Sequence, residues 1–167
     1  MQHQQPDPNY SLGANYIKLN GDTLSPETGI IVHGCNCQGV MGAGIAAQVR
    51  SRYPAAYEIY VKKHRISGLK LGEITYAEVA PNKIIVNANT QFSCGVDRRY
   101  VDYEAVATCF EAVKILARSM EGPGHEKLDI VFPMIGAGLA GGNWKIIETI
   151  ILETIGNEFR KILYVFP

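Results

Sequence analysis

The sequence predicts one α/β domain with three layers, in which helices cover both faces of a mixed, mostly parallel central sheet. Its 167 residues are enough for one well-packed domain and too few for two α/β domains of ordinary size. Hydrophobic residues make up 47% of the chain and charged residues 19%, which is typical of a globular protein. Short strand-like runs alternate with amphipathic helical patterns, and this alternation indicates parallel strands joined through helices.

The strands are expected after a polar N-terminal segment. Because the segment MQHQQPDPNYSL contains proline and has no periodicity, we expect residues 1–12 to be a loose tail and residues 13–167 to form the domain. Six short apolar or alternating runs, bounded by Gly, Pro, Asn or Asp, are then typical of strands. They are Tyr16–Asn20, Gly29–His33, Ile74–Ala80, Lys83–Asn87, Leu128–Phe132 and Lys161–Phe166.

Four helices are expected between these strands. The first begins at Gly44 and runs toward Arg52, and Pro54 stops it because proline cannot continue a helix. A second lies around residues 57–64. In the third and fourth, apolar residues recur every three or four positions, as on one face of an amphipathic helix. They are Tyr103, Val106, Phe110, Val113 and Ala117, and then Trp144, Ile147, Ile151 and Ile155.

Charge and cysteine spacing exclude several classes of function. The formal net charge is zero, so we expect no direct binding of nucleic acid, which needs a broad basic surface. No apolar run approaches the roughly 20 residues that span a bilayer, and no secretory signal precedes the domain. We therefore expect a cytoplasmic protein, in the host cytoplasm if the source is viral, with no membrane partner. The four cysteines lack C-x-x-C spacing, and no metal or other cofactor is expected.

Two glycine-rich segments carry the main functional signal. GCNCQGVMGAGIAAQV follows the strand-like IIVH, and PMIGAGLAGGNW follows DIVF; each leads into a predicted helix. Glycine lets backbone N–H groups approach an anion, and a helix N-terminus adds unpaired donors. Ligands of open α/β sheets bind outside the carboxyl ends of the strands, so the two segments together favour a pyrophosphate site. The alternative is that these glycines serve only tight turns and helix caps.

Two better-known phosphate motifs do not fit. Gly136, Gly138 and Gly141 match G-x-G-x-x-G, but too little chain follows for the remaining strand–helix units of a dinucleotide-binding fold and its acidic ribose ligand. Neither segment ends in the Gly-Lys-Ser/Thr of a P-loop, which excludes that mode of triphosphate hydrolysis.

Together with Gly21-Asp22-Thr23, the segments HGCNCQGVMGAGIA and PMIGAGLAGGNW resemble the ligand loops of macrodomains, over roughly residues 16–166. The resemblance is closest to the branch of viral and fungal ADP-ribose 1″-phosphate phosphatases. It implies a three-layer α/β/α fold and ADP-ribose or ADP-ribose 1″-phosphate as the ligand. ADP-ribosylated macromolecules are further partners that it suggests.

The resemblance also implies ligand-binding residues. Asp22, next to Thr23, would accept a hydrogen bond from the adenine amino group, and Asn36 would bind the distal ribose. Each has a structural alternative, since Asp22 could be a turn residue, Asn36 could form an Asx turn, and Ile45 and Leu139 could be core residues. The diphosphate and distal ribose would lie between two sets of residues, which are Gly42, Ala43, Gly44 and Ile45, and Ile135, Gly136, Ala137, Gly138, Leu139 and Ala140.

Turnover is the harder question. The protein glycohydrolases that the chain partly resembles use a lysine on the strand before the long helix and an aspartate in the second loop. Here the strand and its continuation read IIVNANTQFSCG, and Ala140 stands where the acid is expected. His33 is retained, and its reference pKa near 6.5 suits a general acid or base for water attack on the terminal phosphate, with Asn36 orienting the ribose. The alternative for His33 is a structural hydrogen bond.

An amide-rich stretch completes the candidate site. Asn87, Asn89 and Gln91 would line the distal ribose or phosphate pocket, or instead hydrogen-bond within the sheet. The sequence thus favours a protein that binds ADP-ribose derivatives and slowly hydrolyses ADP-ribose 1″-phosphate. Two alternatives stay open: a reader of ADP-ribose without turnover, and an ADP-ribosyl glycohydrolase acting on modified protein or nucleic acid.

Overall fold

The computed structural model describes residues 15–123 and 126–167, so the expected tail at residues 1–12 lies outside the described residues. Six strands form one sheet in the order β1-β6-β5-β2-β4-β3. All neighbours pair in parallel except β3 and β4, which are antiparallel. The predicted mixed, mostly parallel sheet is confirmed. The strands are β1 (Tyr16–Asn20), β2 (Gly29–Cys35), β3 (Ile74–Ala80), β4 (Lys83–Asn89), β5 (Ile130–Phe132) and β6 (Lys161–Val165).

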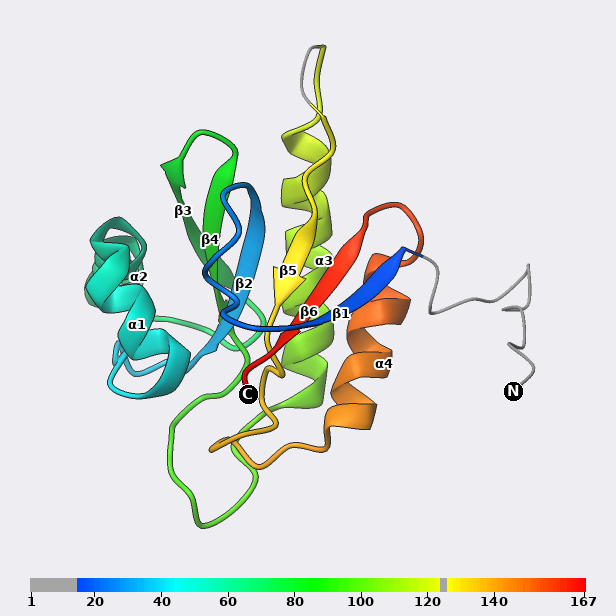
Figure 1. Ribbon diagram of the computed structural model, residues 1–167. Coiled ribbons are helices and arrows are strands. Elements are labelled where there is room, and N and C mark those ends of the chain that lie inside the picture. Colours follow the sequence, from blue (N-terminus) through cyan, green and yellow to red (C-terminus); the bar gives the residue numbers. More distant parts are fainter. Residues whose placement is uncertain (1–14, 124–125) are drawn as a thin grey trace, which may run out of the picture.

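Helices cover the two faces of this sheet, as Figure 1 shows, and the predicted three-layer architecture is confirmed. One face carries α1 (Gly44–Arg52) and α2 (Pro54–Ser67), and the other carries α3 (Tyr103–Ser119) and α4 (Trp144–Ile155). Each pair of helices encloses its own hydrophobic cluster against the sheet. The sheet is therefore buried on both sides, which is why its central strands have nearly continuous apolar sequences.

Residue parity along β2 decides which layer each side chain joins, because successive side chains of a strand point to opposite faces. Ile30 and Val32 belong to the cluster under α3 and α4, whereas Ile31 and Cys35 belong to the cluster under α1 and α2. His33 shares the parity of Ile31 and Cys35. It therefore points toward the α1 and α2 layer.

The boundaries differ from the predicted ones where pairing decides them. β2 and β4 each run two residues further than predicted, because their parallel register continues from His33 opposite Asn87 to Cys35 opposite Asn89. β5 begins at Ile130, two residues after the predicted start at Leu128. Pro54 both ends α1 and starts α2 as its first residue, where a missing N–H costs no helical hydrogen bond. No helix among the described residues is long and apolar enough to cross a membrane.

Phe110 of α3 tests the packing of the larger core. Its side chain is fully buried, and its ring meets that of Phe132 edge to face with the centroids 5.8 Å apart. We expect Phe110→Ala to lower the free energy of unfolding by about 3–5 kcal/mol, because it leaves a cavity between helix and sheet. Urea unfolding followed by circular dichroism measures this loss.

Ile115 provides the matched control on the same helix. Its side chain is 59% exposed, so Ile115→Ala should change the free energy of unfolding by less than about 0.5 kcal/mol. Equal losses in the two variants would contradict the assignment of the core.

Candidate functional site

A cleft of about 540 Å³ lies beyond the carboxyl ends of β2, β4 and β5. Three loops approach one another there: the first loop (residues 36–43), the second loop (residues 133–143) and the third loop (residues 90–102), all at the same end of the sheet in Figure 1. The lining residues come from these loops, the end of β2 and the start of α1. They are Gly34, Cys35, Asn36, Val40, Gly42, Ala43, Gly44, Ile45, Ala46, Gln91, Cys94, Gly95, Val96, Pro133, Met134, Ile135, Gly136, Gly138, Leu139 and Ala140.

The N-terminus of α1 opens into this cleft without a side-chain cap. Ala43 occupies the N-cap position in an extended conformation, and its methyl group cannot accept a hydrogen bond. The first turn of a helix leaves N–H groups without intrahelical acceptors, and here residues 44–46 carry them. In contrast, α3 and α4 are capped by Asp102 and Asn143. Of these three helices, α1 keeps its N-terminal donors for a ligand.

Asn36 shapes the first loop with most of its amide group. Its Nδ2 donates to the carbonyl of Val40 at 2.8 Å, and its Oδ1 accepts from the backbone N–H of Gln38 at 2.9 Å, which is an Asx turn. The hydroxyl of Tyr60 on α2 lies 2.8 Å from the carbonyl oxygen of Asn36 and 2.9 Å from its Oδ1. One N–H of the amide is left over. Asn36 lines the cleft, but most of its amide forms the Asx turn that was the structural alternative. One N–H remains for a ligand.

The second loop turns back on itself under the cleft. Gly136 has a φ of +73°, and a Cβ there would lie 2.6 Å from a methyl group of Val101, so this position requires glycine. Gly142 donates its N–H to the carbonyl of Gly136 at 2.7 Å and closes the turn. Within the described residues, the N–H groups of Gly138, Leu139 and Ala140 have no acceptor. They form a second set of free donors, on the side of the cleft formed by this loop.

The third loop completes the wall, with residues that were not among the predicted ligand contacts apart from Gln91. Phe92 is joined to the first loop, because its carbonyl accepts from the backbone N–H of Cys37 at 2.9 Å and from Nε2 of Gln38 at 3.0 Å. Cys94, Gly95 and Val96 then line the cleft. A signal was present in the sequence, since a connection of this length between a strand and a helix is often functional.

His33 and Asn87 come together, but inside the protein. His33 Nε2 lies 2.7 Å from Asn87 Oδ1, and Asn87 Nδ2 donates to the carbonyl of Ala56 on α2 and to Thr75. Both side chains are fully buried under α2 and do not line the cleft. Because the oxygen of Asn87 only accepts, this contact places the ring hydrogen of His33 on Nε2.

Burial also determines the charge of His33. It lowers the pKa of His33 to about 4, and the hydrogen bond that His33 donates to Asn87 opposes this only in part. The imidazole is therefore neutral at neutral pH and out of reach of a molecule in the cleft. This geometry does not support the expected role of His33 as an acid or base in contact with substrate. The physical reason is that His33 lies within β2, two residues before the strand end that lines the cleft, where α2 covers it.

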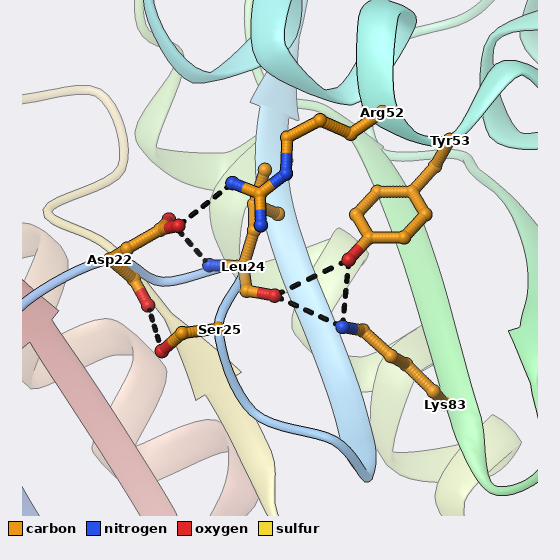
Figure 2. Close-up of polar contacts among 6 residues, drawn as sticks. All are labelled: Asp22, Leu24, Ser25, Arg52, Tyr53 and Lys83. Atoms are coloured by element: carbon orange, nitrogen blue, oxygen red, sulfur yellow. Dashed lines mark hydrogen bonds and ion pairs between the residues drawn. The ribbon is translucent and has the colours of Figure 1, made fainter.

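Other predicted residues also lie away from the cleft. Asn89 is fully buried, and its Nδ2 donates to the carbonyl of Lys70. Ala137 belongs to the second loop without lining the cleft. Asp22 and the buried Thr23 follow β1, and Asp22 is paired with Arg52 at the far end of α1 (Figure 2). The predicted residues that do line the cleft are Asn36, Gly42, Ala43, Gly44, Ile45, Gln91, Ile135, Gly136, Gly138, Leu139 and Ala140.

No lining residue of the described chain carries a charged side chain. Cys35 lies at the floor, but burial raises the pKa of its thiol well above its ordinary value, so the sulfur stays protonated. This disfavours a covalent route through Cys35. No group of three or more His, Cys, Asp or Glu side chains in the described ranges is arranged to hold a metal ion. The cleft offers a ligand backbone donors and apolar walls.

Comparison with known proteins agrees with this arrangement. The Macro domain family matches residues 32–151, which include the second half of β2, the first loop and the second loop. The chain belongs to the macro domain family. Macro domain membership accounts for both glycine-rich loops at one edge of the sheet.

Two curated relatives match along nearly their whole length. The uncharacterized 17.5 kDa protein in the tk-vs intergenic region of Enterobacteria phage T4 is 32% identical over 155 residues, which cover 89% of this chain and 93% of the phage protein. The ADP-ribose 1″-phosphate phosphatase of Saccharomyces cerevisiae is 27% identical over 168 residues, covering 86% of this chain and 95% of the yeast protein. Among solved structures, a protein of unknown function from Bacteroides thetaiotaomicron superposes with a TM-score of 0.80 at 25% identity, covering 91% of this chain and 98% of that one.

The buried state of His33 predicts a pH dependence of stability. Its folded-state pKa of about 4 lies below the unfolded value near 6.5, so between these values the unfolded state binds a proton that the folded state does not. Stability from this residue is intact above pH 6.5 and is lost as the pH falls toward 4. Between pH 7 and pH 5 we expect about 2 kcal/mol of loss.

Two measurements check this expectation. Urea unfolding at pH 7 and pH 5 should show a smaller loss for His33→Gln, which keeps an N–H donor for Asn87, than for the wild type. An NMR titration of the His33 ring protons should show no midpoint above pH 5. A midpoint near 6.5 would mean that the ring is open to water.

Proposed function

We propose that the protein binds ADP-ribose and its derivatives in the cleft, with the pyrophosphate between the first and second loops. The observation that carries the proposal is the pair of unused donor sets, the N-terminal N–H groups of α1 and those of residues 138–140, on two sides of one cleft. A helix N-terminus and a glycine-rich turn both favour anions. The size of the cleft is ordinary for a small-molecule site.

No lining residue of the described chain is charged, which supports a ligand that is held by the shape of the cleft and by backbone N–H groups of the protein. Arginine or lysine would attract any polyphosphate, whereas fixed N–H groups bind tightly only an anion that reaches both loops. The apolar rim, which includes Val40, Val96 and Leu139, suits the faces of ribose rings. Selectivity for a linked diphosphate with sugars on both sides follows from this combination.

Ala43→Asp separates ligand binding from folding. An aspartate at this N-cap position would accept hydrogen bonds from the first turn of α1 and stabilise the helix by about 0.5–2 kcal/mol. The same carboxylate would occupy and repel the site of the pyrophosphate. We expect an unchanged or higher melting temperature and at least a roughly tenfold loss of affinity for ADP-ribose, measured by isothermal titration calorimetry.

Gln48→Glu is the matched control. It adds the same charge to the same helix at an exposed position outside the cleft lining. Its affinity for ADP-ribose should stay within about twofold of the wild type. Wild-type protein that takes up no ADP-ribose would overturn the proposal, and so would Ala43→Asp with wild-type affinity.

A second candidate function is hydrolysis of ADP-ribose 1″-phosphate. It is favoured by the relation to the yeast phosphatase over 86% of the chain and by the shared retention of a histidine before the first loop that the sequence analysis noted. Water would attack the terminal phosphorus, the bond to the 1″ oxygen would break, and ADP-ribose and inorganic phosphate would leave. Backbone donors would stabilise the charge on the phosphoryl oxygens.

The described residues give such a reaction little acid–base help. The cleft is lined by no carboxylate, imidazole or amine, so turnover should be slow. We assign His33 a positioning role, since its bond to Asn87 joins β2 to β4 directly beneath Gly34 and Cys35. The one spare N–H of Asn36 remains for a ribose or phosphate oxygen. A lysine-dependent glycohydrolase is less well supported, because amides and Thr90 stand at the end of β4.

Phosphorus NMR distinguishes the candidates in one sample. The protein is mixed with ADP-ribose 1″-phosphate without added metal. Perturbed pyrophosphate resonances with growth of inorganic phosphate would establish phosphatase turnover, and Asn36→Ala would then be compared. Perturbed pyrophosphate resonances without phosphate release would leave a reader of ADP-ribose. Unchanged resonances would contradict binding itself.

A further inference from the structure

The α1 and α2 layer carries an excess of positive charge. Residues 44–70 hold six lysines and arginines and one glutamate, whereas the whole chain has 16 basic and 16 acidic residues. The cations are Arg50, Arg52, Lys62, Lys63, Arg65 and Lys70. Because α1 and α2 lie on the opposite side of the sheet from α3 and α4, the excess is confined to one side of the protein (Figure 1).

A groove of about 420 Å³ runs along α2 within this basic layer. Its lining residues recur every three or four positions and therefore lie on one side of the helix. They are Tyr57, Glu58, Val61, Lys62, Arg65 and Ile66. Ile66 is 73% exposed, although isoleucine is usually buried in a folded protein. The α2 groove thus combines apolar surface with two cations.

The cations at the α2 groove have no counter-ion. Among the described residues, Lys62, Arg65 and the neighbouring Arg50 form no ion pair. Arg50 lies over the ring of Tyr57 at the edge of the groove, with its guanidinium carbon 4.6 Å from the ring centroid. Three exposed positive charges are therefore open to an anionic partner.

Both ends of the α2 groove adjoin walls of the cleft. At one end, Arg50 follows the cleft-lining Ala46 by one turn of α1, so both lie on the same side of that helix. At the other end, His64 precedes Arg65 and packs beneath the first loop, where a Cβ on Gly39 would lie 2.7 Å from the His64 ring. A chain that leaves the cleft across the first loop therefore meets the groove next.

We infer that the α2 groove binds an acidic, partly apolar segment of a polypeptide to which ADP-ribose is attached. This inference rests on the proposed function, since it concerns what the ligand in the cleft is joined to. Acidic side chains of the segment pair with Lys62 and Arg65, and its apolar side chains cover Val61 and Ile66. The cleft then recognises the modification, and the groove recognises the protein that carries it.

A polypeptide fits this groove better than a nucleic acid does. Glu58 is among the lining residues and would repel a backbone that carries a phosphate at every nucleotide. Bases stack on aromatic rings, but Arg50 already covers the ring of Tyr57, and the other apolar lining residues are aliphatic. Aliphatic and acidic side chains on one peptide match both kinds of surface in the groove.

The experiment compares ADP-ribose conjugates of two peptides of about 12 residues, long enough to span the groove when extended. One peptide contains glutamate and leucine, and in the other glutamine replaces every glutamate. ADP-ribose is joined to the same end of each through a stable linker, and affinities for the full chain are measured by isothermal titration calorimetry. We expect the wild type to bind the acidic conjugate about tenfold more tightly than the neutral one, as a few exposed ion pairs provide.

Lys62→Glu and Arg65→Glu each reverse one charge of the groove at an exposed position of α2. In both variants the preference for the acidic conjugate should fall below about threefold. Their affinity for free ADP-ribose should stay within about twofold of the wild type, since neither residue lines the cleft. Lys70→Glu is the matched control, because it reverses an exposed charge of the same layer outside the groove, and it should keep the preference.

Three results would overturn the inference. The first is equal affinity of the wild type for the two conjugates, or a preference that survives in Lys62→Glu and Arg65→Glu. The second is tighter binding of an ADP-ribose conjugate of a single-stranded oligonucleotide, lost in Lys62→Glu, which would assign the groove to nucleic acid. The third is a dimer in light scattering that Ile66→Ser dissociates, which would assign the groove to a second copy of the chain.

Failure of the inference and failure of the proposed function are distinguishable, because free ADP-ribose is titrated beside the conjugates. Wild-type protein that binds free ADP-ribose and both conjugates equally retains the cleft as the ligand site and loses the role of the α2 groove. Wild-type protein that takes up no free ADP-ribose removes the proposed function itself.

Discussion

Parallel pairing of β2 with β4 on one side and β5 on the other is the constraint on which the site depends. Parallel strands end at one edge of a sheet, so the loops that follow these three strands must meet there. The register of β2 with β4 also extends the two strands to Cys35 and Asn89 and brings the start of the third loop beside the first. The three walls of the cleft are thus a result of strand order, and the glycines only make the approach close enough.

Local pattern was sufficient to predict the elements of this fold. Helical spacing located α4, and the Gly44 and Pro54 signals gave both limits of α1 correctly. Strand ends were less accurate, since β2 and β4 continue as far as their partners allow, and a single sequence does not contain its pairing. Residues of both glycine-rich loops line the cleft. The glycines and helix starts predicted a pyrophosphate site, whereas ADP-ribose as the whole ligand was suggested by resemblance, because free backbone donors do not specify the rest of a ligand.

Side-chain roles were harder to predict for a physical reason. His33 and Asn87 are polar residues at strand ends near a candidate site, and composition cannot show whether they point outward or into a helix–sheet interface. Depth within the strand decides it, since α2 covers His33, whereas Cys35, two residues further along the same face, lines the cleft. Asn36 illustrates a related limit, since an amide that suits a ribose equally suits an Asx turn, and here the turn and Tyr60 use most of it. Gly95 and Val96 of the third loop were not predicted because their side chains carry no distinctive chemistry.

The cap of α1 has a consequence for how such a site changes over evolutionary time. With an alanine at this position and free amides in the second loop, the proposed mode of binding depends on the path of the main chain. Substitutions that preserve the path leave it intact, so neutral drift can replace most side chains while the ligand stays the same. Sequence identity between such chains then reflects the time since they diverged more than it reflects a shared ligand. Comparison of backbone geometry should recognise homologues that sequence comparison misses.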